Sequence, residues 1–355
     1  MEQTNHLPDM LALLPQPAFC AENGVVTWVN QAAVQRQVEP GCAIASLLKT
    51  GAEEYADFTA GKLYLTLSVA QQQYGATVTR MGEYDVFLLA QETEQAELHA
   101  LSLAAQQLRE PLAGIMAAAD RLFPKLSESE ATQAAHINQG LFQLLRLIGN
   151  MSDASRYTQS KSPLMETVNI TALFEEVFAS VEELASQAAH TLHFEGLSKD
   201  LYCLANRELL ERAVYNLVSN ALKFSPKDTE IFASLKREKN KLYLTVTDNG
   251  EGVADSMRGN VFSGFLREPG IADGRFGIGL GMVLVRAAAN AHGGTVLIQQ
   301  PEAGGTKVSL TIALRQNDGG VFNAPVFTVD YAGERDHGLI ELSDSLPASA
   351  YDKIT

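Results

Sequence analysis

Three short segments in the second half of the chain combine residue types that bind phosphate groups. The first, N-L-V-S-N-A-L-K-F, spaces Asn216, Asn220 and Lys223 by four and three residues, so a helix would carry the three side chains on one face. Amide oxygens are hard ligands that suit Mg²⁺, and an ammonium group can neutralise phosphate charge. The segment therefore predicts a helix face that meets phosphate, and a solvated polar face is the alternative.

The second segment, D-N-G-E-G, begins at Asp248, directly after the strand-like run 242–247. A carboxylate at a strand end can accept a hydrogen bond from the amino group of a base such as adenine. Gly250 and Gly252 would let the chain turn sharply beside that base. A plain turn is the alternative interpretation, because D-N-G is also a common turn sequence.

The third segment, G-R-F-G-I-G-L-G-M, is rich in glycine and precedes an apolar helix expected at 282–291. Its glycines are Gly274, Gly277, Gly279 and Gly281. Glycines let backbone N–H groups approach phosphate oxygens, and the N-terminus of a helix adds a favourable dipole. The three segments together predict one phosphate-binding site.

Helix and strand signals between residues 161 and 315 supply the elements that would position these segments. Helices are expected at 171–187 and 208–224, and antiparallel strands at 230–236, 241–247, 294–300 and 306–314. The pattern predicts an α/β sandwich over 161–315. Residues 316–355 form a tail to which the pattern assigns no role.

Residues 96–160 have a helical period. Pro124 ends a first helix, and Ser127 with Glu130 forms a capping box for a second. Two such helices cannot bury both of their apolar stripes alone, so a dimeric four-helix bundle is expected, with an antiparallel arm packed on its own domain as the alternative. The stripes are Leu98, Leu101, Ala105, Leu108, Leu112, Ile115, Ala119 and Leu122, and then Ala134, Ile137, Leu141, Leu144, Ile148 and Met151.

Residues 1–95 predict a small α+β domain. The pair Asn23-Gly24 between the runs 18–20 and 25–29 is a strong hairpin signal, and further strands are expected at 63–67 and 84–89. The order L-L-P-Q-P-A-F-C, hairpin, V-N-Q-A-A resembles the start of a PAS sensory domain.

The boxes of the last domain resemble the ATP-binding domain of the GHKL superfamily, and within it that of bacterial sensor histidine kinases. The resemblance covers about residues 98–314, and the boxes are Asn216 to Phe224, Asp248 to Gly252, Phe262 with Phe265, Gly277 to Gly281, and H-G-G-T from His292. It implies an α/β-sandwich Bergerat fold that binds ATP and Mg²⁺, with Asn220 as the Mg²⁺ ligand and the hairpin as the dimerisation domain. The residues implied in nucleotide binding are Asn216, Asn220, Lys223, Phe224, Asp248, Gly250, Gly252, Gly277, Gly279, Leu280 and Gly281.

Asn216 separates this chain from relatives that hydrolyse ATP with water. Gyrase and the Hsp90 chaperones carry a glutamate base four residues before the metal-binding asparagine, and here that position is Asn216. Steady hydrolysis is therefore not expected, and the domain resembles those that hold ATP for transfer to another group.

The segment A-A-Q-Q-L-R-E-P-L, residues 104–112, resembles the phosphoacceptor motif of that family without its reactive residues. The pattern H-E-L-R-x-P-L or H-D-L-R-x-P-L aligns Gln106 with the histidine and Gln107 with the acidic neighbour. An imidazole nitrogen is a nucleophile near neutral pH, whereas a glutamine amide is neither nucleophilic nor basic. Because His99 and His136 lack the L-R-x-P-L frame, self-phosphorylation is not expected.

Three functions remain open. The first is a pseudokinase that binds Mg-ATP, forms a homodimer and regulates or pairs with an active partner kinase. The second is a kinase that phosphorylates a histidine on another chain, since transfer between subunits is possible in a four-helix bundle. The third is a response-regulator phosphatase in which the amide of Gln107 orients a water. The loss of both reactive groups favours the first.

Composition limits the partners. A formal net charge of -15 disfavours nucleic acid and anionic membrane surfaces. Cys20, Cys42 and Cys203 are widely spaced, which argues for reduced thiols instead of disulfides or a zinc site. The polar N-terminus, and apolar runs well short of the roughly 18 residues of a membrane span, predict a cytoplasmic protein without an integral membrane segment.

Overall fold

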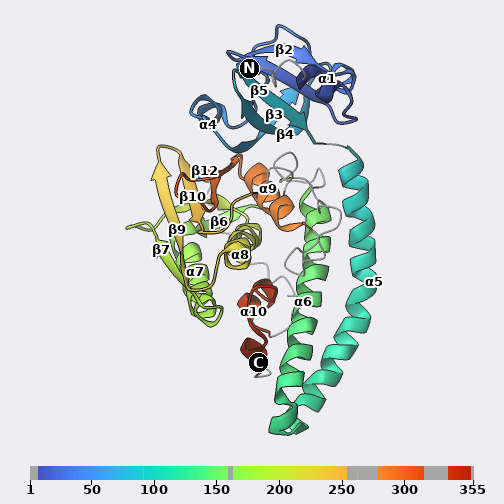
Figure 1. Cartoon of the computed structure of the whole chain (residues 1–355), viewed down its shortest axis with the longest axis vertical. Coiled ribbons are helices and arrows are strands. Elements are labelled where there is room, and N and C mark those ends of the chain that lie inside the picture. Colours follow the sequence, from blue (N-terminus) through green and yellow to red (C-terminus); the bar gives the residue numbers. More distant parts are fainter. Residues whose placement is uncertain are drawn as a thin grey trace.

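The computed structural model describes residues 7–90, 92–158, 163–253, 262, 279–315 and 335–352. An N-terminal domain lies at one end, a long helical hairpin runs along one side, and an α/β domain lies beside the hairpin (Figure 1). A C-terminal segment, residues 335–352, lies between the α/β domain and the hairpin. None of the described helices is both long enough and apolar enough to cross a membrane.

The N-terminal domain is built on an antiparallel sheet in the order β2-β1-β5-β4-β3. The predicted hairpin is confirmed, because Asn23 and Gly24 join β1 to β2 with φ angles of 52° and 75°. The sequence does not predict β4, whose first half, Q-Q-Y-G, is poor in β-branched residues. The elements are α1 (Leu7–Ala12), β1 (Ala18–Glu22), β2 (Val25–Val29), α2 (Gln31–Gln35), α3 (Ile44–Leu47), α4 (Ala52–Ala56), β3 (Lys62–Val69), β4 (Gln72–Met81) and β5 (Tyr84–Leu89).

The α/β domain contains every element that the sequence predicts for it. Helices α7, α8 and α9 pack against one face of the strands, and β7 pairs with β9 in parallel while β9, β10, β12 and β11 are antiparallel. Three short strands, β6, β7 and β8, are additional. The elements are β6 (Glu166–Asn169), α7 (Ile170–Gln187), β7 (His190–Glu195), β8 (Tyr202–Ala205), α8 (Arg207–Phe224), β9 (Thr229–Glu238), β10 (Lys241–Thr247), α9 (Gly281–Ala291), β11 (Val296–Gln299) and β12 (Lys307–Ala313).

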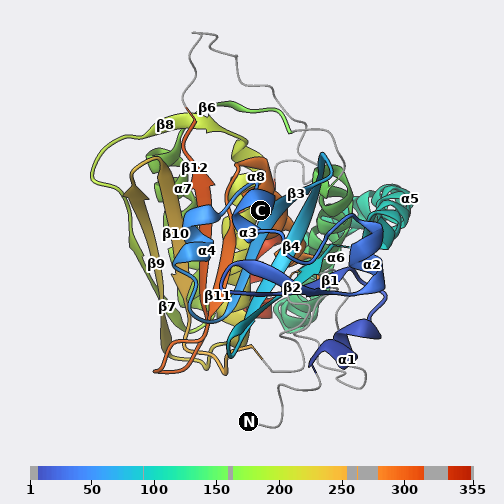
Figure 2. The ribbon, with the colours of Figure 1, turned by 90° about the horizontal axis from the view of Figure 1, so that it is seen from above.

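The sheets of these two domains are continuous. Strand β3 pairs with β11 from Tyr64 opposite Val296 to Lys62 opposite Ile298, so ten strands form one sheet (Figure 2). Side chains reinforce the junction: Asn290 donates to the Tyr64 hydroxyl over 2.8 Å, and Lys241 donates to both carboxylate oxygens of Glu54. The N-terminal domain is therefore docked on the edge of the α/β domain through backbone pairing.

The hairpin consists of α5 (Glu92–Leu122), a 3₁₀ turn η1 (Phe123–Lys125) and α6 (Glu128–Thr158). Its turn follows the predicted signals. Helix α5 ends two residues before Pro124, and the Glu130 carboxylate accepts the backbone N–H of Ser127 over 2.9 Å at the start of α6.

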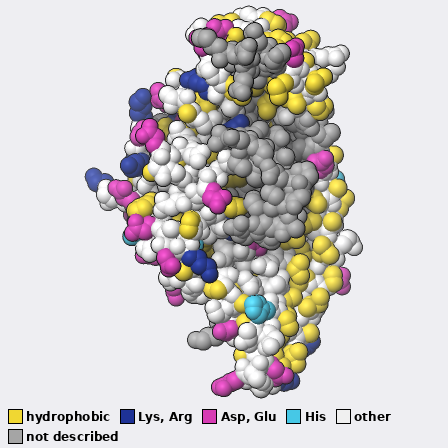
Figure 3. Space-filling model, viewed as in Figure 1, with side chains coloured by type: hydrophobic (Ala, Val, Ile, Leu, Met, Phe, Trp, Pro, Cys, Tyr) yellow, Lys and Arg dark blue, Asp and Glu magenta, His cyan; other side chains and the backbone are white. Residues whose placement is uncertain are grey.

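The apolar stripe predicted on α5 divides into two lines. Leu98, Ala105, Leu112 and Ala119, seven residues apart, are buried, mainly against α6. The alternate line is exposed and consists of Leu108, Ile115 and Leu122, continued on α6 by Ile137 and Leu144, all between 46% and 55% exposed. Hydrophobic side chains accordingly gather along the flank of the molecule over α5 (Figure 3).

The C-terminal segment has its own short elements, α10 (His337–Glu341) and the 3₁₀ turn η3 (Ala348–Tyr351). Ile340, Leu342, Leu346 and Tyr351 are buried in the core that α6, α7 and α8 share. Asn138 and Gln139 of α6 donate to the backbone carbonyls of Tyr351 and Leu346, over 3.1 and 2.8 Å. The tail is thus packed against the α/β domain and α6 at once.

Candidate functional site

Helix α8 carries the first predicted box. The Asn206 side chain caps it by accepting the N–H of Leu209 over 2.8 Å, and the helix buries its apolar face in the domain core. Asn216 is buried, and its Nδ2 donates to the Arg212 carbonyl over 2.8 Å. Asn220 and Phe224 are partly exposed further along the helix. The amide pair therefore lies on α8 as the spacing predicts.

Asn216 also faces the glycine segment. A β-carbon at Gly281, the first residue of α9, would lie 2.8 Å from Asn216 Oδ1. Gly279 has a φ of 77°, which only glycine adopts readily, and the intervening Leu280 is buried. The first and third boxes are thereby in contact. Gly277, Gly274 and Phe265 lie outside the described residues.

Asp248 directly follows β10, and backbone N–H groups hold its side chain. Its Oδ1 accepts the N–H groups of Gly250 and Thr306 over 2.8 and 3.0 Å. Burial raises the pKa of this carboxyl, and the two N–H donors oppose that shift. The Thr306 side chain also hydrogen-bonds to this carboxyl, so Asp248 is held in place at the end of β10.

The glycines of the second box are required by their surroundings. A β-carbon at Gly250 would lie 2.7 Å from the Phe224 carbonyl oxygen, and one at Gly252 would lie 2.6 Å from Gln300 Nε2. Gly252 also has a φ of 81°. The second box therefore packs directly on the end of the first, so all three boxes converge.

His292 of the H-G-G-T box links α9 to the start of α8. Its Nε2 accepts the N–H of Asn206 over 3.0 Å, and its Nδ1 lies 2.7 Å from the Ala288 carbonyl. This pattern requires the neutral tautomer protonated at Nδ1. Burial lowers the pKa of His292 to about 4, which keeps the ring neutral. The sequence identifies the H-G-G-T box, but it does not predict that His292 connects α9 to the start of α8.

Phe262, the other described aromatic residue of the predicted boxes, is buried under the N-terminal domain. Its ring meets that of Tyr64 at 5.6 Å between centroids, and its carbonyl accepts from Arg286 over 2.9 Å. Phe262 is therefore in contact with β3.

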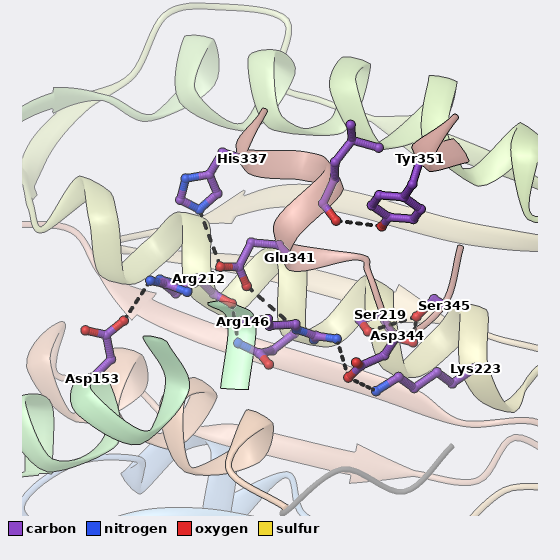
Figure 4. A network of polar contacts seen from close by, with 12 residues as sticks. Arg146, Asp153, Arg212, Ser219, Lys223, His337, Glu341, Asp344, Ser345 and Tyr351 are labelled. Carbon is purple, nitrogen blue, oxygen red and sulfur yellow. Dashed lines mark hydrogen bonds and ion pairs between the residues drawn. The ribbon is translucent and has the colours of Figure 1, made fainter. Parts of the chain in front are cut away.

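Lys223 does not extend into solvent. Its Nζ lies 2.8 Å from Asp344 Oδ2 in the C-terminal segment, and Arg146 of α6 approaches the same oxygen at 2.8 Å (Figure 4). Burial and the nearby Arg146 lower the pKa of Lys223 although it is paired. Burial would raise the pKa of Asp344, but Arg146 and Lys223 together hold it below its usual range. The sequence gives no signal of this contact, because Lys223 and Asp344 are 121 residues apart.

The segment that resembles the phosphoacceptor motif lies in α5, which runs on the far side of α6 from the α/β domain (Figure 1). Gln106 and Gln107 are exposed, as are His99 and His136. Arg109 donates to Ser152 of α6 over 3.0 Å. Both amide side chains are therefore open to solvent.

Comparison with known proteins identifies the domain that holds the three boxes. The family described as "Histidine kinase-, DNA gyrase B-, and HSP90-like ATPase" matches residues 205–316. The sensor protein KdpD of Clostridium acetobutylicum is 26% identical over 221 residues, which are 60% of this chain and 24% of KdpD. The histidine protein kinase DivJ of Caulobacter vibrioides is 30% identical over 236 residues, 62% of this chain and 39% of DivJ. The chain thus spans well under half the length of either relative.

Among solved structures, full-length ShkA in complex with AMPPNP aligns with a TM-score of 0.50 and 21% identity, over 62% of this chain and 46% of that chain. This is a likeness of fold. The chain is a homologue of bacterial sensor histidine kinases, and its residues 205–316 carry their ATPase-type domain.

Proposed function

We propose that the chain is a cytoplasmic signalling protein of the sensor histidine kinase type that binds Mg-ATP without phosphorylating itself. The observation that carries the nucleotide site is the convergence of three segments far apart in sequence: Asn216 lies against Gly281, and Gly250 lies against the Phe224 carbonyl. Similarity of fold alone does not require these contacts. A nucleotide site formed by all three segments does require them. ShkA is bound to the ATP analogue AMPPNP, which agrees with this assignment.

The roles of the residues follow from their chemistry. The Asp248 carboxylate accepts a hydrogen bond from the amino group of adenine, while backbone N–H groups of Gly250 and Thr306 hold its Oδ1. The backbone at Gly279, Leu280 and Gly281 receives phosphate at the start of α9. Asn220 offers an amide oxygen on the same face of α8, a donor that fits Mg²⁺ when phosphate oxygens and water complete its octahedral shell.

Self-phosphorylation is absent in this proposal because α5 has no nucleophile at the required position. Gln106 is exposed, so a histidine there could meet a kinase domain, but a glutamine amide cannot attack phosphorus. Pro111 of the L-R-x-P-L frame lies inside α5, and the helix continues through the frame. The chain then acts by pairing with an active kinase or by engaging a response regulator.

Dimerisation is supported by the exposed apolar line on the hairpin. Leu108, Ile115 and Leu122 recur every seven residues on α5, and Ile137 and Leu144 do so on α6. A heptad line of exposed leucine and isoleucine is the surface that a second hairpin would bury in a four-helix bundle. The partner is a second copy of this chain or the hairpin of a related kinase.

The N-terminal domain is proposed to be a PAS-like sensory module. Its five-stranded antiparallel sheet, with α2, α3 and α4 inserted between β2 and β3, supports this assignment. Its direct pairing with β11 would let a change in this domain reach the strands beside the nucleotide site.

Calorimetric titration with Mg-ATP tests the site. The wild type should bind, and Asn220→Ala and Asp248→Ala should each weaken binding at least about tenfold, or ~1.4 kcal/mol. Asp248→Ala should also reduce the preference for ATP over GTP, because it removes the contact that reads adenine. Asn240→Ala, in the exposed turn between β9 and β10, is the matched control and should bind as the wild type does.

A wild type that gives neither heat nor a thermal shift with millimolar Mg-ATP would contradict the proposal. If Asn220→Ala and Asp248→Ala bind Mg-ATP as tightly as the wild type does, the proposed roles of these residues are wrong, but nucleotide binding itself is not contradicted.

A further inference from the structure

The C-terminal segment contacts four helices, two in the hairpin and two in the α/β domain. Arg335 pairs with Asp120 of α5 at 2.6 Å, the carbonyls of residues 346 and 351 accept from α6, and Ser345 Oγ lies 3.0 Å from Ser219 Oγ of α8. Gly338 is packed on α7, since a β-carbon there would lie 2.8 Å from Leu184. The segment therefore bridges the hairpin and the α/β domain.

A buried network of charges lies at the centre of this bridge (Figure 4). Glu341 is fully buried and contacts both Arg212 of α8 and, at 3.9 Å, Arg146 of α6. Asp344 lies 2.8 Å from Arg146 and 2.8 Å from Lys223. The chain of contacts alternates in sign: Asp153, Arg212, Glu341, Arg146, Asp344, Lys223.

The carboxylates of Glu341 and Asp344 neutralise the buried cations of this network. Helices α6 and α8 contribute the cations Arg146, Arg212 and Lys223 but only one of the anions, Asp153. Buried cations are costly without partners, so the interface between α6 and α8 depends on Glu341 and Asp344. With the segment undocked, the three cations would favour separation of the helices or binding of another anion.

The segment covers the flank of α8 next to the proposed phosphate-binding face. Arg212, Ser219 and Lys223 are spaced by seven and four residues, so they form one stripe along the helix. Asn216 and Asn220 lie on the same side of the helix, and Lys223 follows them by seven and three residues. Lys223 therefore adjoins both the residues that meet the segment and the two amides, and it can serve either Asp344 or a phosphate group.

We propose that residues 335–352 are an inhibitory strap, in which Asp344 withholds Lys223 from phosphate and the segment locks α6 against α8. Nucleotide binding and the docked segment then oppose one another. The proposal rests on the proposed Mg-ATP site. Thermodynamic linkage makes the opposition reciprocal: removing the Asp344 charge strengthens nucleotide binding, and nucleotide loosens the segment.

The first measurement compares Mg-ATP affinity by calorimetry in the wild type, Asp344→Asn and the control Asp352→Asn. Asp344→Asn keeps the size of the side chain and removes its charge, so affinity should rise at least about fivefold, the lower end of typical coupling between linked sites. Asp352 is exposed in the same segment, and its variant should bind as the wild type does. Thermal unfolding of each protein shows whether the fold is retained.

The second measurement follows the segment itself by amide hydrogen exchange in the wild type. The N–H groups of Leu342, Leu346 and Ala350 are bonded within the segment, to the carbonyls of residues 338, 342 and 347. Their exchange should accelerate when Mg-ATP saturates the protein. Unchanged or slower exchange at saturation would overturn the proposal.

The outcomes separate the two proposals. If the wild type and Asp344→Asn bind Mg-ATP equally, or the variant binds more weakly, the strap is refuted while the nucleotide site stands. If neither protein binds Mg-ATP, both the nucleotide site and the proposed opposition between nucleotide binding and docking of the segment are refuted. Binding by Asp344→Asn alone supports both.

Discussion

The side chain of Asn216 lies so close to Gly281 that a β-carbon at position 281 would come within 2.8 Å of Asn216 Oδ1. This contact joins the helix that carries the two amides to the first turn of α9. Position 281 therefore requires glycine because a larger side chain would collide with Asn216, whatever its backbone conformation. A substitution there tests how closely α8 and α9 must pack.

Gly281→Ala should therefore force Asn216 or α9 to shift and weaken Mg-ATP binding about tenfold, which corresponds to ~1.4 kcal/mol. Gly114→Ala is the matched control, because Gly114 lies inside α5 with nothing within 4 Å of an added β-carbon. That control should keep nucleotide affinity and raise the free energy of unfolding by about 0.5–1 kcal/mol through helix propensity. Calorimetry and chemical denaturation measure the two effects, and a Gly281→Ala protein with unaltered affinity would contradict the contact.

The stability of the α/β domain should depend on the protonation of His292. Its pKa is lowered from 6.5 to about 4, so the unfolded state takes up the proton more readily between these values. The stability from the neutral ring is fully present above about pH 6.5 and is lost as the pH falls toward 4. The loss amounts to about 3 kcal/mol.

His292→Gln is the variant that isolates this effect. A glutamine can accept from the Asn206 N–H and donate to the Ala288 carbonyl without titrating, so the variant should lose less stability between pH 6.5 and 4 than the wild type does. His136→Gln, at an exposed position of α6, should behave as the wild type. Denaturant unfolding across this pH range gives the slope of the free energy of unfolding against pH. Identical slopes for His292→Gln and the wild type would refute the assignment of the pH effect to His292.

The exposed line of the hairpin should mediate dimerisation. Leu108→Glu combined with Leu144→Glu introduces charges that a bundle would have to bury unpaired, so the double variant should be monomeric. Ala113→Glu with Thr132→Glu adds the same charges at exposed positions off this line and should remain dimeric. Light scattering at micromolar concentration measures the mass, and a monomeric wild type would refute the bundle.

Local patterns predict most elements of the α/β domain, because α8, β10 and α9 have strong periodicity and their boxes begin or end them. The sequence also predicts the turn of the hairpin, where Ser127 and Glu130 act within four residues. It does not divide the apolar stripe of α5 into a buried and an exposed line, since both lines have the same residue types. That division depends on where α6 lies.

The contacts of the tail are beyond such patterns for a different reason. Asp344 and Lys223 are 121 residues apart, and nothing local in L-S-D-S specifies a basic partner. The pairing of β3 with β11 is equally non-local, because an edge strand carries no signal of which other edge it joins. The candidate site is thus largely predictable from the sequence, whereas its coupling to the tail and to the N-terminal domain is not.

Incubation with γ-labelled Mg-ATP tests the central claim most directly, using the wild type and the double variant Gln106→His with Gln107→Glu. The variant restores a nucleophile and its orienting carboxylate within the L-R-x-P-L frame, so it should acquire label that is labile in acid and stable in base, provided that the ATPase-type domain can reach α5. The wild type should acquire none. Label on the wild-type chain would contradict the account and direct attention to His99 or His136, and a double variant that binds Mg-ATP but stays unlabelled would contradict the view that the two glutamines alone silence it.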